Sequence, residues 1–326
     1  MRSQIVGTGS YVPERVLTNF DFEKLVETSD QWIFDRTGIR ERRMAAPGEA
    51  SSDMAAAASL RALEMAGVKP EDLDLIIVGT ISADMPLPSC AAFLQAKLGA
   101  VNAVAFDIAA ACAGSLYAMA IADRFIVSGQ SKRVLVVGVE LLTRIMDWTD
   151  RNTCVLFGDA AGAMVMAPTD DDDRGLLSTH LHTDGRQAEI LYMPGGGSRS
   201  PASADTIAAK AHFVKMNGRE VYKCAVRNLT SVLGEALAAN HCTAGDLDHL
   251  ITHQANLRIL EAVLERFEIP KEKCWLNLQK YGNTSSASLP MSFDEANRAG
   301  RFRQGDLIAM MAIGAGMAWG SAMMRW

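Results

Sequence analysis

The sequence lacks any run of eighteen uncharged apolar residues, the length that a membrane-spanning helix requires. Its first residues, Met1 to Tyr11, are expected to form a strand and a turn rather than a signal peptide. A net positive charge is also missing, because 38 acidic and 32 basic residues give a net charge of −6. That balance argues against a nucleic-acid surface as the main function. The sequence therefore predicts a soluble cytoplasmic protein that binds neither a membrane nor nucleic acid.

Closely spaced cysteine pairs are the second absence. The six cysteines are Cys90, Cys112, Cys154, Cys224, Cys242 and Cys274. Their spacing fits neither a zinc site nor a disulfide framework. Most of them are expected to be small buried hydrophobic residues. His180 and His182 alternate on an expected strand, but no carboxylate or thiol stands at ligand spacing beside them. We therefore expect no metal site.

A large buried core is present, since 49% of the 326 residues are hydrophobic. Helical and strand patterns alternate along the chain, which predicts an α/β fold with largely buried sheets. Leu73–Gly79 and Arg133–Val139 are short apolar strands, and the alanine-rich Ser52–Ala66 is a helix. The length favours about two domains or one large duplicated domain.

The second half of the chain repeats the pattern of the first. The strand around Leu75-Ile76 corresponds to that around His249-Leu250, and residues 132–138 correspond to 305–311. The same alignment places Cys112–Leu116 on Ser285–Leu289, and His253 at the position of Gly79. We therefore predict two similar halves, 1–172 and 173–326, joined at an acidic stretch from Asp170 to Asp173. Chance similarity between apolar runs is the alternative.

Cys112 is the strongest candidate for chemistry. It lies between an apolar run ending at Ile108 and the helical stretch Leu116–Ile126. A thiol at the point where a strand turns into a helix faces free N–H groups and the helix dipole, which favour the thiolate. Small neighbours such as Ala111 and Gly114 would let a substrate approach. This pattern predicts a cysteine nucleophile for acyl transfer.

Two other polar segments follow expected strands. His253 comes after Leu250–Thr252, and Asn283 lies in a Gly-Asn-Thr-Ser turn. Taken singly, a histidine after a strand is more often structural, and Gly-Asn is a common turn dipeptide. Since sites in such folds collect at the carboxyl ends of strands, the three residues together favour one shared site.

With these residues the chain resembles the 3-oxoacyl-(acyl carrier protein) synthase III family over nearly its whole length. The resemblance implies the thiolase fold, in which two similar halves form a layered αβαβα core, usually as a homodimer. It also implies that Cys112, His253 and Asn283 are the family's catalytic Cys-His-Asn set. The matching segments are Gly7–Pro13, Thr28–Ile33, Arg36–Arg42, Phe157–Ala163, His253–Arg258 and Gly282–Ser288.

The reaction implied by the resemblance has two halves. Cys112 attacks an acyl-CoA primer to give an acyl-enzyme, while backbone N–H groups at Cys112 and Ala315 hold the thioester oxyanion. Malonyl-acyl carrier protein then loses carbon dioxide, with His253 and Asn283 donating hydrogen bonds to the enolate. The carbanion attacks the acyl group and gives 3-oxoacyl-carrier protein. This chemistry needs no cofactor.

The resemblance also implies substrate contacts. The family's CoA-binding positions correspond to Thr28, Trp32, Arg36, Arg151 and Asn256, with adenine held between Trp32 and Arg151. Carrier-protein docking corresponds to Lys223, Arg258 and Arg266, for which a solvated helix face is the alternative. The acyl pocket corresponds to Leu87, Leu142, Phe157 and Leu191, with Leu87 reaching across the dimer. Leucine at position 87 leaves room for primers longer than acetyl.

One departure from the family concerns Ala315, which stands in a turn that is normally all glycine; a positive φ there would cost stability. A related condensing enzyme that makes a secondary metabolite, and a non-catalytic acyl-carrier binding protein, are the main alternatives. A thiolase normally has a second active-site cysteine, which Ala309–Met324 does not contain. A cysteine hydrolase lacks sequence support, and Gly7-x-Gly9 lacks the third glycine of a dinucleotide site.

Overall fold

The computed structural model describes residues 1–326. Its strands are β1 (Arg2–Tyr11), β2 (Arg15–Thr18), β3 (Glu41–Met44), β4 (Leu75–Gly79), β5 (Val104–Ile108), β6 (Val134–Leu141), β7 (Asp159–Thr169), β8 (Gly175–Thr183), β9 (Leu191–Tyr192), β10 (Lys215–Met216), β11 (His249–Thr252), β12 (Leu307–Gly314) and β13 (Ala318–Arg325). Its α-helices are α1 (Asn19–Phe22), α2 (Asp30–Thr37), α3 (Ser51–Ala66), α4 (Cys90–Leu98), α5 (Gly114–Val127), α6 (Ala204–Ala208), α7 (Gly218–Ala239), α8 (Leu257–Arg266), α9 (Leu278–Tyr281) and α10 (Ser288–Arg298). None of these helices has both the length and the apolar character needed to cross a bilayer.

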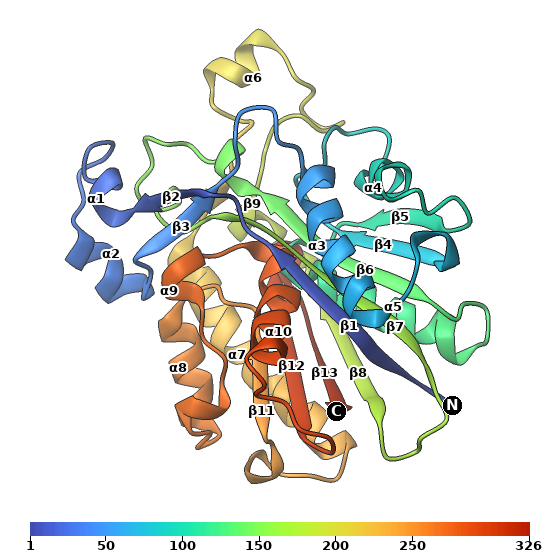
Figure 1. Ribbon diagram of the computed structural model, residues 1–326. Helices are drawn as coiled ribbons and strands as arrows, with labels where there is room; N and C mark the ends of the chain where they lie inside the picture. The colour runs from blue at the N-terminus through green and yellow to red at the C-terminus, as the bar shows by residue number, and fades with distance from the viewer.

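Two mixed sheets form the centre of the molecule (Figure 1). The first has the order β1-β7-β6-β4-β5 and the second the order β8-β13-β12-β11. In the first sheet β4 runs parallel to β6, while β7 is antiparallel to both β6 and β1. The second sheet repeats this arrangement, because β11 runs parallel to β12 and β13 is antiparallel to β12 and β8. The repeat read from the sequence is thus a repeat of strand order and direction.

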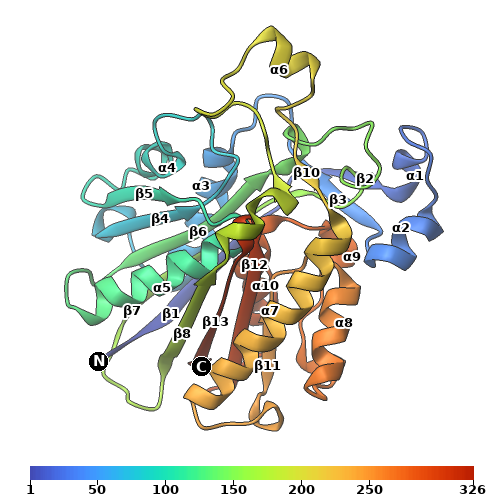
Figure 2. The same ribbon diagram turned by 180° about the vertical axis from the view of Figure 1, so that it is seen from behind.

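Helices separate and cover the two sheets. Helices α5 and α10 contact strands of both sheets and form the central layer. Helices α3 and α4 pack on the outer face of the first sheet, and α7 covers the second sheet with α8 beside it. Figures 1 and 2 show these layers from opposite sides. The predicted αβαβα order is therefore confirmed.

The residue alignment between the halves needs a correction of one position. A 3-10 turn, Ala111–Ala113, precedes α5, and a matching turn, Ser285–Ala287, precedes α10. Each turn begins with a residue of positive φ, 45° at Ala111 and 48° at Ser285. Ala111 therefore corresponds to Ser285, and the counterpart of Cys112 is Ser286. The strand registers give the same offset, since Leu75 pairs with Val134 and His249 pairs with Ile308. Pattern matching slipped by one residue because neighbouring positions of a buried strand are all apolar. The boundary at residues 172 and 173 stays a prediction.

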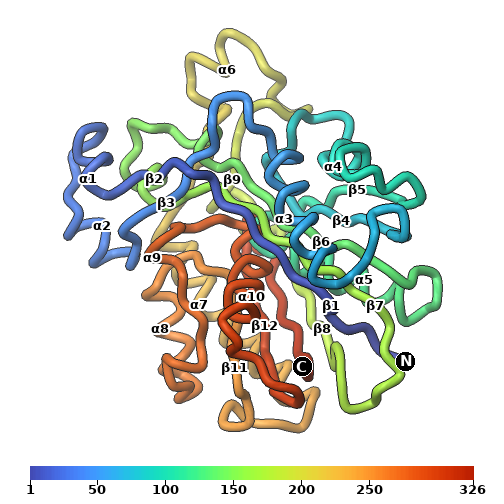
Figure 3. The backbone as a smooth tube through the Cα atoms, in the orientation of Figure 1, coloured from blue at the N-terminus to red at the C-terminus, as the bar shows by residue number.

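The paired glycines of β1 serve helix packing. A Cβ at Gly7 would lie 2.3 Å from the Ala62 carbonyl oxygen of α3, and one at Gly9 would lie 2.2 Å from that of Ala58. The Gly-x-Gly pattern therefore reflects the close approach of α3 to the sheet. Farther along the chain, the segment around α6 projects beyond the two sheets, as the tube in Figure 3 shows.

Candidate active site

Cys112 lies in a tight elbow between β5 and α5. Its side chain is buried, with 7% of the residue exposed. The elbow depends on the left-handed conformation of Ala111 and on Gly314 at the end of β12, in the other half. A Cβ at Gly314 would stand 2.6 Å from the Cys112 backbone nitrogen. Only a glycine allows this approach, so the second half of the chain helps to shape the nucleophile turn.

The resting state of Cys112 differs from the expectation. Burial raises the pKa of its thiol to about 12, and a hydrogen bond with the Ser285 side chain only partly opposes this effect. The charge of Glu140 raises the pKa further. Desolvation outweighs the helix N-terminus, whose effect is on the order of 1 kcal/mol. Cys112 therefore rests as a thiol, and acyl transfer needs a group that removes its proton.

His253 follows the last residue of β11. Its backbone N–H donates to the Met311 carbonyl at 2.8 Å, and only 2% of the residue is exposed. Burial lowers the pKa of its imidazole to about 3, against a hydrogen bond with the Ser285 backbone. The ring is thus neutral near pH 7 and carries one N–H donor. Its buried Nδ1 has no protein partner.

Asn283 is held by the backbone on both sides. Its N–H donates to the Leu156 carbonyl at 2.8 Å, and its own carbonyl accepts from the Gly158 N–H at 3.0 Å. Its side-chain oxygen Oδ1 accepts from the Ser285 backbone N–H at 2.8 Å. This bond fixes the orientation of the carboxamide and leaves the amide nitrogen Nδ2 as a free donor.

One cavity of about 1040 Å³ brings the three predicted residues together. Cys112, His253 and Asn283 all lie on its wall. Other predicted substrate residues line the same cavity: Trp32, Arg36, Arg151, Phe157, Leu191, Lys223, Asn256 and Arg258. Five of the predicted residues do not line it: Thr28, Leu87 and Arg266, together with Leu142 and Ala315, which line a second cavity.

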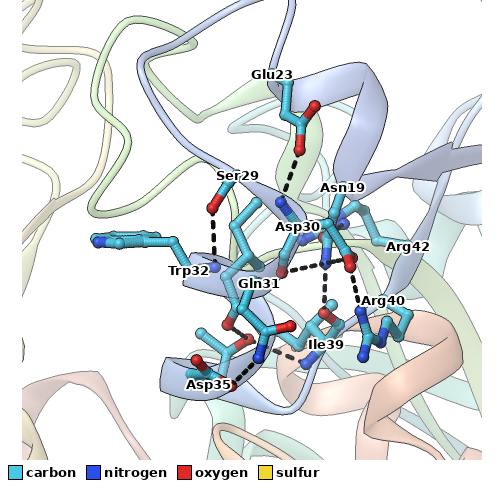
Figure 4. Close-up of polar contacts among 12 residues, drawn as sticks. Asn19, Glu23, Ser29, Asp30, Gln31, Trp32, Asp35, Ile39, Arg40 and Arg42 are labelled. Atoms are coloured by element: carbon cyan, nitrogen blue, oxygen red, sulfur yellow. Dashed lines mark hydrogen bonds and ion pairs between the residues drawn. The ribbon is translucent and has the colours of Figure 1, made fainter.

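At the outer end of this cavity, Trp32 is presented by a rigid helix. Ser29 caps α2 by accepting from the Trp32 N–H at 3.1 Å. Asp30, in the same turn, accepts from the Asn19 side chain at 2.8 Å and pairs with Arg40. Figure 4 shows this network on one side of α2 and the Trp32 ring extending away from it. Since these bonds hold the helix, the indole keeps a defined position at the cavity rim.

Two arginines lie against the Trp32 ring. The guanidinium carbon of Arg36 lies 4.3 Å from the centroid of the Trp32 ring, and that of Arg151 lies 4.9 Å from it. A base stacked between the ring and Arg151 needs two contacts of about 3.5 Å each, or about 7 Å in all. The adenine sandwich is therefore not preformed. Arg151, which donates to the Glu27 carbonyl at 2.7 Å, has to move aside to admit a nucleobase.

The remaining polar residues at the rim have structural partners. Asn256 caps α8 through its side-chain oxygen and donates from Nδ2 to the Arg36 carbonyl at 2.9 Å, which ties α8 to α2. Lys223 pairs with Glu220 at 2.8 Å. The Arg258 guanidinium lies 5.9 Å from the Tyr222 ring centroid. The outcome for carrier-protein docking thus stays a prediction for Lys223, Arg258 and Arg266.

A second, smaller cavity of about 220 Å³ continues from Cys112. Its wall is nearly all apolar and includes Leu142, Phe157 and Leu191, as predicted for the acyl pocket. The other lining residues are Ile81, Ala111, Ile145, Met146, Tyr192, Met193, Val214, Ser285 and Ala315. Leu87 does not line it and is 83% exposed, so within one chain it lies outside the pocket.

Ala315 causes no backbone strain. Positive φ values in this turn occur at Gly316 (74°) and Met317 (47°), whereas Ala315 itself is not in the left-handed region. The cost considered for Ala315 therefore does not arise. Ala315 and Cys112, the two residues predicted to hold the oxyanion, line the same apolar cavity.

Sequence reasoning missed Glu140, which is fully buried in β6. Its Oε1 accepts from the Ser285 hydroxyl at 3.1 Å, and its Oε2 accepts from the Ile81 N–H at 3.2 Å. Burial raises the pKa of its carboxyl to about 7, against these hydrogen bonds. The available signal was a lone acidic residue in the otherwise apolar run Val134–Leu141.

Comparison with known proteins shows the family to which this chain is similar. Sequence models of 3-oxoacyl-(acyl carrier protein) synthase III match residues 106–185, and those of its C-terminal part match residues 237–326. A beta-ketoacyl-(acyl carrier protein) synthase III from Caldanaerobacter subterraneus is 51% identical over 99% of this chain and 97% of its own length.

Solved structures show the same architecture. The crystal structure of 3-oxoacyl-(acyl carrier protein) synthase III from Aquifex aeolicus is similar with a TM-score of 0.92 and 45% identity, covering 99% of this chain and 100% of the other. The priming beta-ketosynthase of the R1128 polyketide pathway also has a TM-score of 0.92, at 36% identity, covering 99% of this chain and 96% of the other.

Proposed function

This chain belongs to the 3-oxoacyl-(acyl carrier protein) synthase III family and is an acyltransferase that condenses an acyl-CoA primer with malonyl-acyl carrier protein, and we propose how its residues divide the work. The observation that carries the assignment is the meeting of Cys112, His253 and Asn283 on one cavity wall. The condensation starts type II fatty acid synthesis.

In the first half-reaction, Cys112 acts as the nucleophile. Its sulfur attacks the thioester carbonyl of the primer, and the backbone N–H groups of Cys112 and Ala315 stabilise the oxyanion. The acyl chain enters the apolar cavity beside Cys112, while CoA departs along the larger cavity past Asn256 toward Trp32. The cationic side chains of Arg36 and Arg151 at that rim suit the CoA phosphates.

In the second half-reaction, His253 and Asn283 donate hydrogen bonds to the enolate oxygen that forms as carbon dioxide leaves. The free Nδ2 of Asn283 and the neutral imidazole of His253 support this assignment, since both carry an N–H donor. The carbanion then attacks the acyl carbon, the bond to Cys112 sulfur breaks, and 3-oxoacyl-carrier protein is released. Neither half-reaction transfers an electron, so we propose that the enzyme needs no resident cofactor.

The size of the acyl cavity supports primers longer than acetyl. An apolar cavity of about 150 Å³ can hold benzene, with six carbon atoms, whereas the cavity here measures about 220 Å³. We propose that straight or branched primers of about four to six carbons load onto Cys112 in addition to acetyl. A polyketide-type priming role remains the second candidate function, because the R1128 priming ketosynthase shares the fold over nearly the whole chain.

A homodimer is proposed as the working assembly. Strand β5 is the edge of the first sheet, and exposed apolar side chains lie on it and near it: Val104 (65% exposed), Val101 (75%) and Leu87 (83%). An open edge strand with apolar neighbours is suited to pairing with a second copy. Size-exclusion chromatography with light scattering tests this, and Val104→Lys should shift the protein toward monomer.

The activity is tested by intact-mass analysis after mixing the protein with acetyl-, butyryl-, hexanoyl- and isobutyryl-CoA. We expect one acyl group per chain, mapped to Cys112 by peptide analysis. Cys112→Ser is the matched control and should remain folded, dimeric and unlabelled. Stoichiometric labelling of Cys112→Ser, or no labelling of the unaltered chain by any primer, would contradict the proposal.

A further inference from the structure

The buried carboxylate of Glu140 has no part in the two half-reactions as described. It lies in β6 with 0% of the residue exposed, and no basic side chain forms an ion pair with it. A buried carboxylate without a cationic partner is costly to maintain. Perturbed groups of this kind gather at functional sites. Glu140 is therefore a candidate for a role beyond packing.

The two oxygens of Glu140 have different partners. Oε2 accepts from the backbone N–H of Ile81 at 3.2 Å and from the hydroxyls of Thr80 and Ser82, so it holds the segment that follows β4. Oε1 accepts from the Ser285 hydroxyl alone, at 3.1 Å. Oε2 thus makes the bonds that hold the neighbouring backbone, whereas Oε1 is bonded only to Ser285.

Ser285 also meets the nucleophile. The 3-10 turns that carry Cys112 and Ser285 pack against each other, and both side chains line the acyl cavity. The Ser285 hydroxyl lies near enough to the Cys112 sulfur to lower the pKa of its thiol, against the larger effect of burial. A hydroxyl both donates and accepts, so the Ser285 oxygen can take a proton from sulfur while its own proton passes to Glu140.

Resting on the proposed function, we propose that Glu140 is the proton acceptor for Cys112 during acyl transfer and that it acts through the Ser285 hydroxyl. In this arrangement Ser285 is the bridge between the halves, because it belongs to the turn before α10 whereas Glu140 and Cys112 belong to the first half. Glu140 touches no substrate and is a positioning and proton-holding residue.

The step is balanced as follows. The S–H bond of Cys112 breaks as an O–H bond forms at Ser285 Oγ, and the Ser285 proton forms an O–H bond at Glu140 Oε1. The sulfur electron pair forms the bond to the thioester carbonyl carbon, and the bond to CoA sulfur then breaks with its electron pair on that sulfur. The proton returns through Ser285 to the CoA sulfur. The products are CoA thiol, acylated Cys112 and the Glu140 carboxylate.

The surrounding groups favour Glu140 over other acceptors. With the pKa of its imidazole lowered to about 3 by burial, His253 is a poor base. Burial raises the pKa of Glu140 to about 7, which matches a base that works near neutral pH. Besides Cys112, the ionisable group that faces Glu140 is Cys90 of α4, a thiol whose pKa is raised mainly by burial. The charges of Asp84 and Asp107 also raise the pKa of the Cys90 thiol.

The test is the single-turnover rate of Cys112 acylation from pH 5.5 to 9, read by intact mass with the primer that loads fastest. In the unaltered enzyme we expect the rate to rise with pH through an apparent pKa near 7, because the acceptor must be ionised. Glu140→Gln should lose this inflection and acylate about 100-fold more slowly at pH 8, as expected for loss of a general base. It should still decarboxylate malonyl-carrier protein once loaded.

Ser285→Ala provides an independent variant. Alanine tolerates the positive φ of this position, since Ala111 adopts the same conformation at 45°. We expect the same loss as in Glu140→Gln, and no further loss in the double variant, because both changes break one chain of bonds. Thr80→Val is the matched control: it removes the 3.4 Å bond to Oε2 and a 3.1 Å bond from the Ser82 N–H, leaves the bond from Ser285 to Oε1 in place, and should keep the pH inflection.

Three results would overturn the proposal. The first is a folded Glu140→Gln that acylates like the unaltered enzyme between pH 6 and 8, and the second is a double variant in which the two losses of rate multiply. The third is a Glu140→Gln in which both half-reactions slow equally. Alkylation by iodoacetamide separates the relay from the primer chemistry. If no acyl-CoA loads the unaltered chain but its alkylation inflection near pH 7 disappears in Glu140→Gln, the proposed function fails and the relay stands.

Discussion

The Ser285 backbone N–H donates to Oδ1 of Asn283 at 2.8 Å, and this bond decides which end of the carboxamide faces the cavity. With the oxygen occupied, the NH₂ group is the one available to substrate. The donor role that we propose for Asn283 thus rests on a backbone contact two residues along the chain. Its consequence can be measured by replacing the amide without changing its size.

Asn283→Asp is expected to keep Cys112 loading and to lose condensation. One aspartate oxygen can still accept from Ser285, but the other presents a negative charge where the enolate oxygen needs a donor. Loss of one such donor costs about 100- to 1000-fold in rate. Acyl loading is measured by intact mass and carbon dioxide release from malonyl-carrier protein in the same samples. Decarboxylation by Asn283→Asp at the unaltered rate would contradict the donor assignment.

His253→Ala should also separate the half-reactions. We expect acylation of Cys112 to persist and decarboxylative condensation to fall by at least about 100-fold. Because burial lowers the pKa of His253 to about 3, the unaltered ring stays neutral from pH 5 to 8. Protonation of His253 should therefore leave no inflection in the condensation rate within that range. Equal loss of both half-reactions in His253→Ala would count against this division of labour.

The titration of Glu140 should make the free energy of unfolding depend on pH. Burial raises the pKa of its carboxyl in the folded chain to about 7 from the ordinary glutamate value of 4.5. The folded state therefore binds a proton that the unfolded state releases, so this stabilisation is present below pH 4.5 and is lost as pH rises to about 7. The loss is on the order of 3 kcal/mol. Glu140→Gln should lack it.

Urea unfolding of both proteins at several pH values from 4.5 to 8 measures this difference. Relative to Glu140→Gln, the unaltered protein should become less stable with rising pH. His253 affects both proteins equally, and its lowered pKa acts in the opposite direction between about 3 and 6.5. Parallel stability curves for the two proteins would show that Glu140 titrates normally.

Leu142→Phe should narrow the range of primers. Leu142 lines the acyl cavity and is 2% exposed, so the larger ring takes up space meant for the chain. We expect hexanoyl loading to fall about 10- to 100-fold relative to acetyl loading, since each methylene is worth about 1–3 kcal/mol. Leu60→Phe on the exposed face of α3 is the matched control. An unchanged ratio of hexanoyl to acetyl loading in Leu142→Phe would place the acyl chain elsewhere.

Much of this architecture could be predicted because apolar periodicity marks buried strands and helices. The helix Ser51–Ala66 and the strands around Leu75 and Val134 are found within two residues of their expected bounds. The positions of Cys112, His253 and Asn283 at strand ends were sufficient to expect one site. Family resemblance added the substrate residues, of which Trp32, Arg36 and Arg151 do meet at the cavity rim.

The remaining features depend on contacts between distant segments. The raised pKa of Cys112 arises from burial, which local sequence does not encode. Glu140 was missed because its partners, Ile81 and Ser285, come from separate segments. The approach of Arg151 to Trp32 likewise reflects packing between α2 and a loop more than a hundred residues away.

The contact between Gly314 and the Cys112 turn has a further meaning for the chain as a whole. Together with the Phe157–Asn283 bridge, it makes the site an interface between the repeats. Cys112 comes from one repeat, and His253, Asn283 and Gly314 come from the other. If the chain were divided at the acidic stretch Asp170–Asp173, neither repeat alone would contain a complete pocket. Selection for activity therefore acts on both repeats at once. A substitution that weakens the contacts between the repeats would lower the reaction rate before either repeat unfolds.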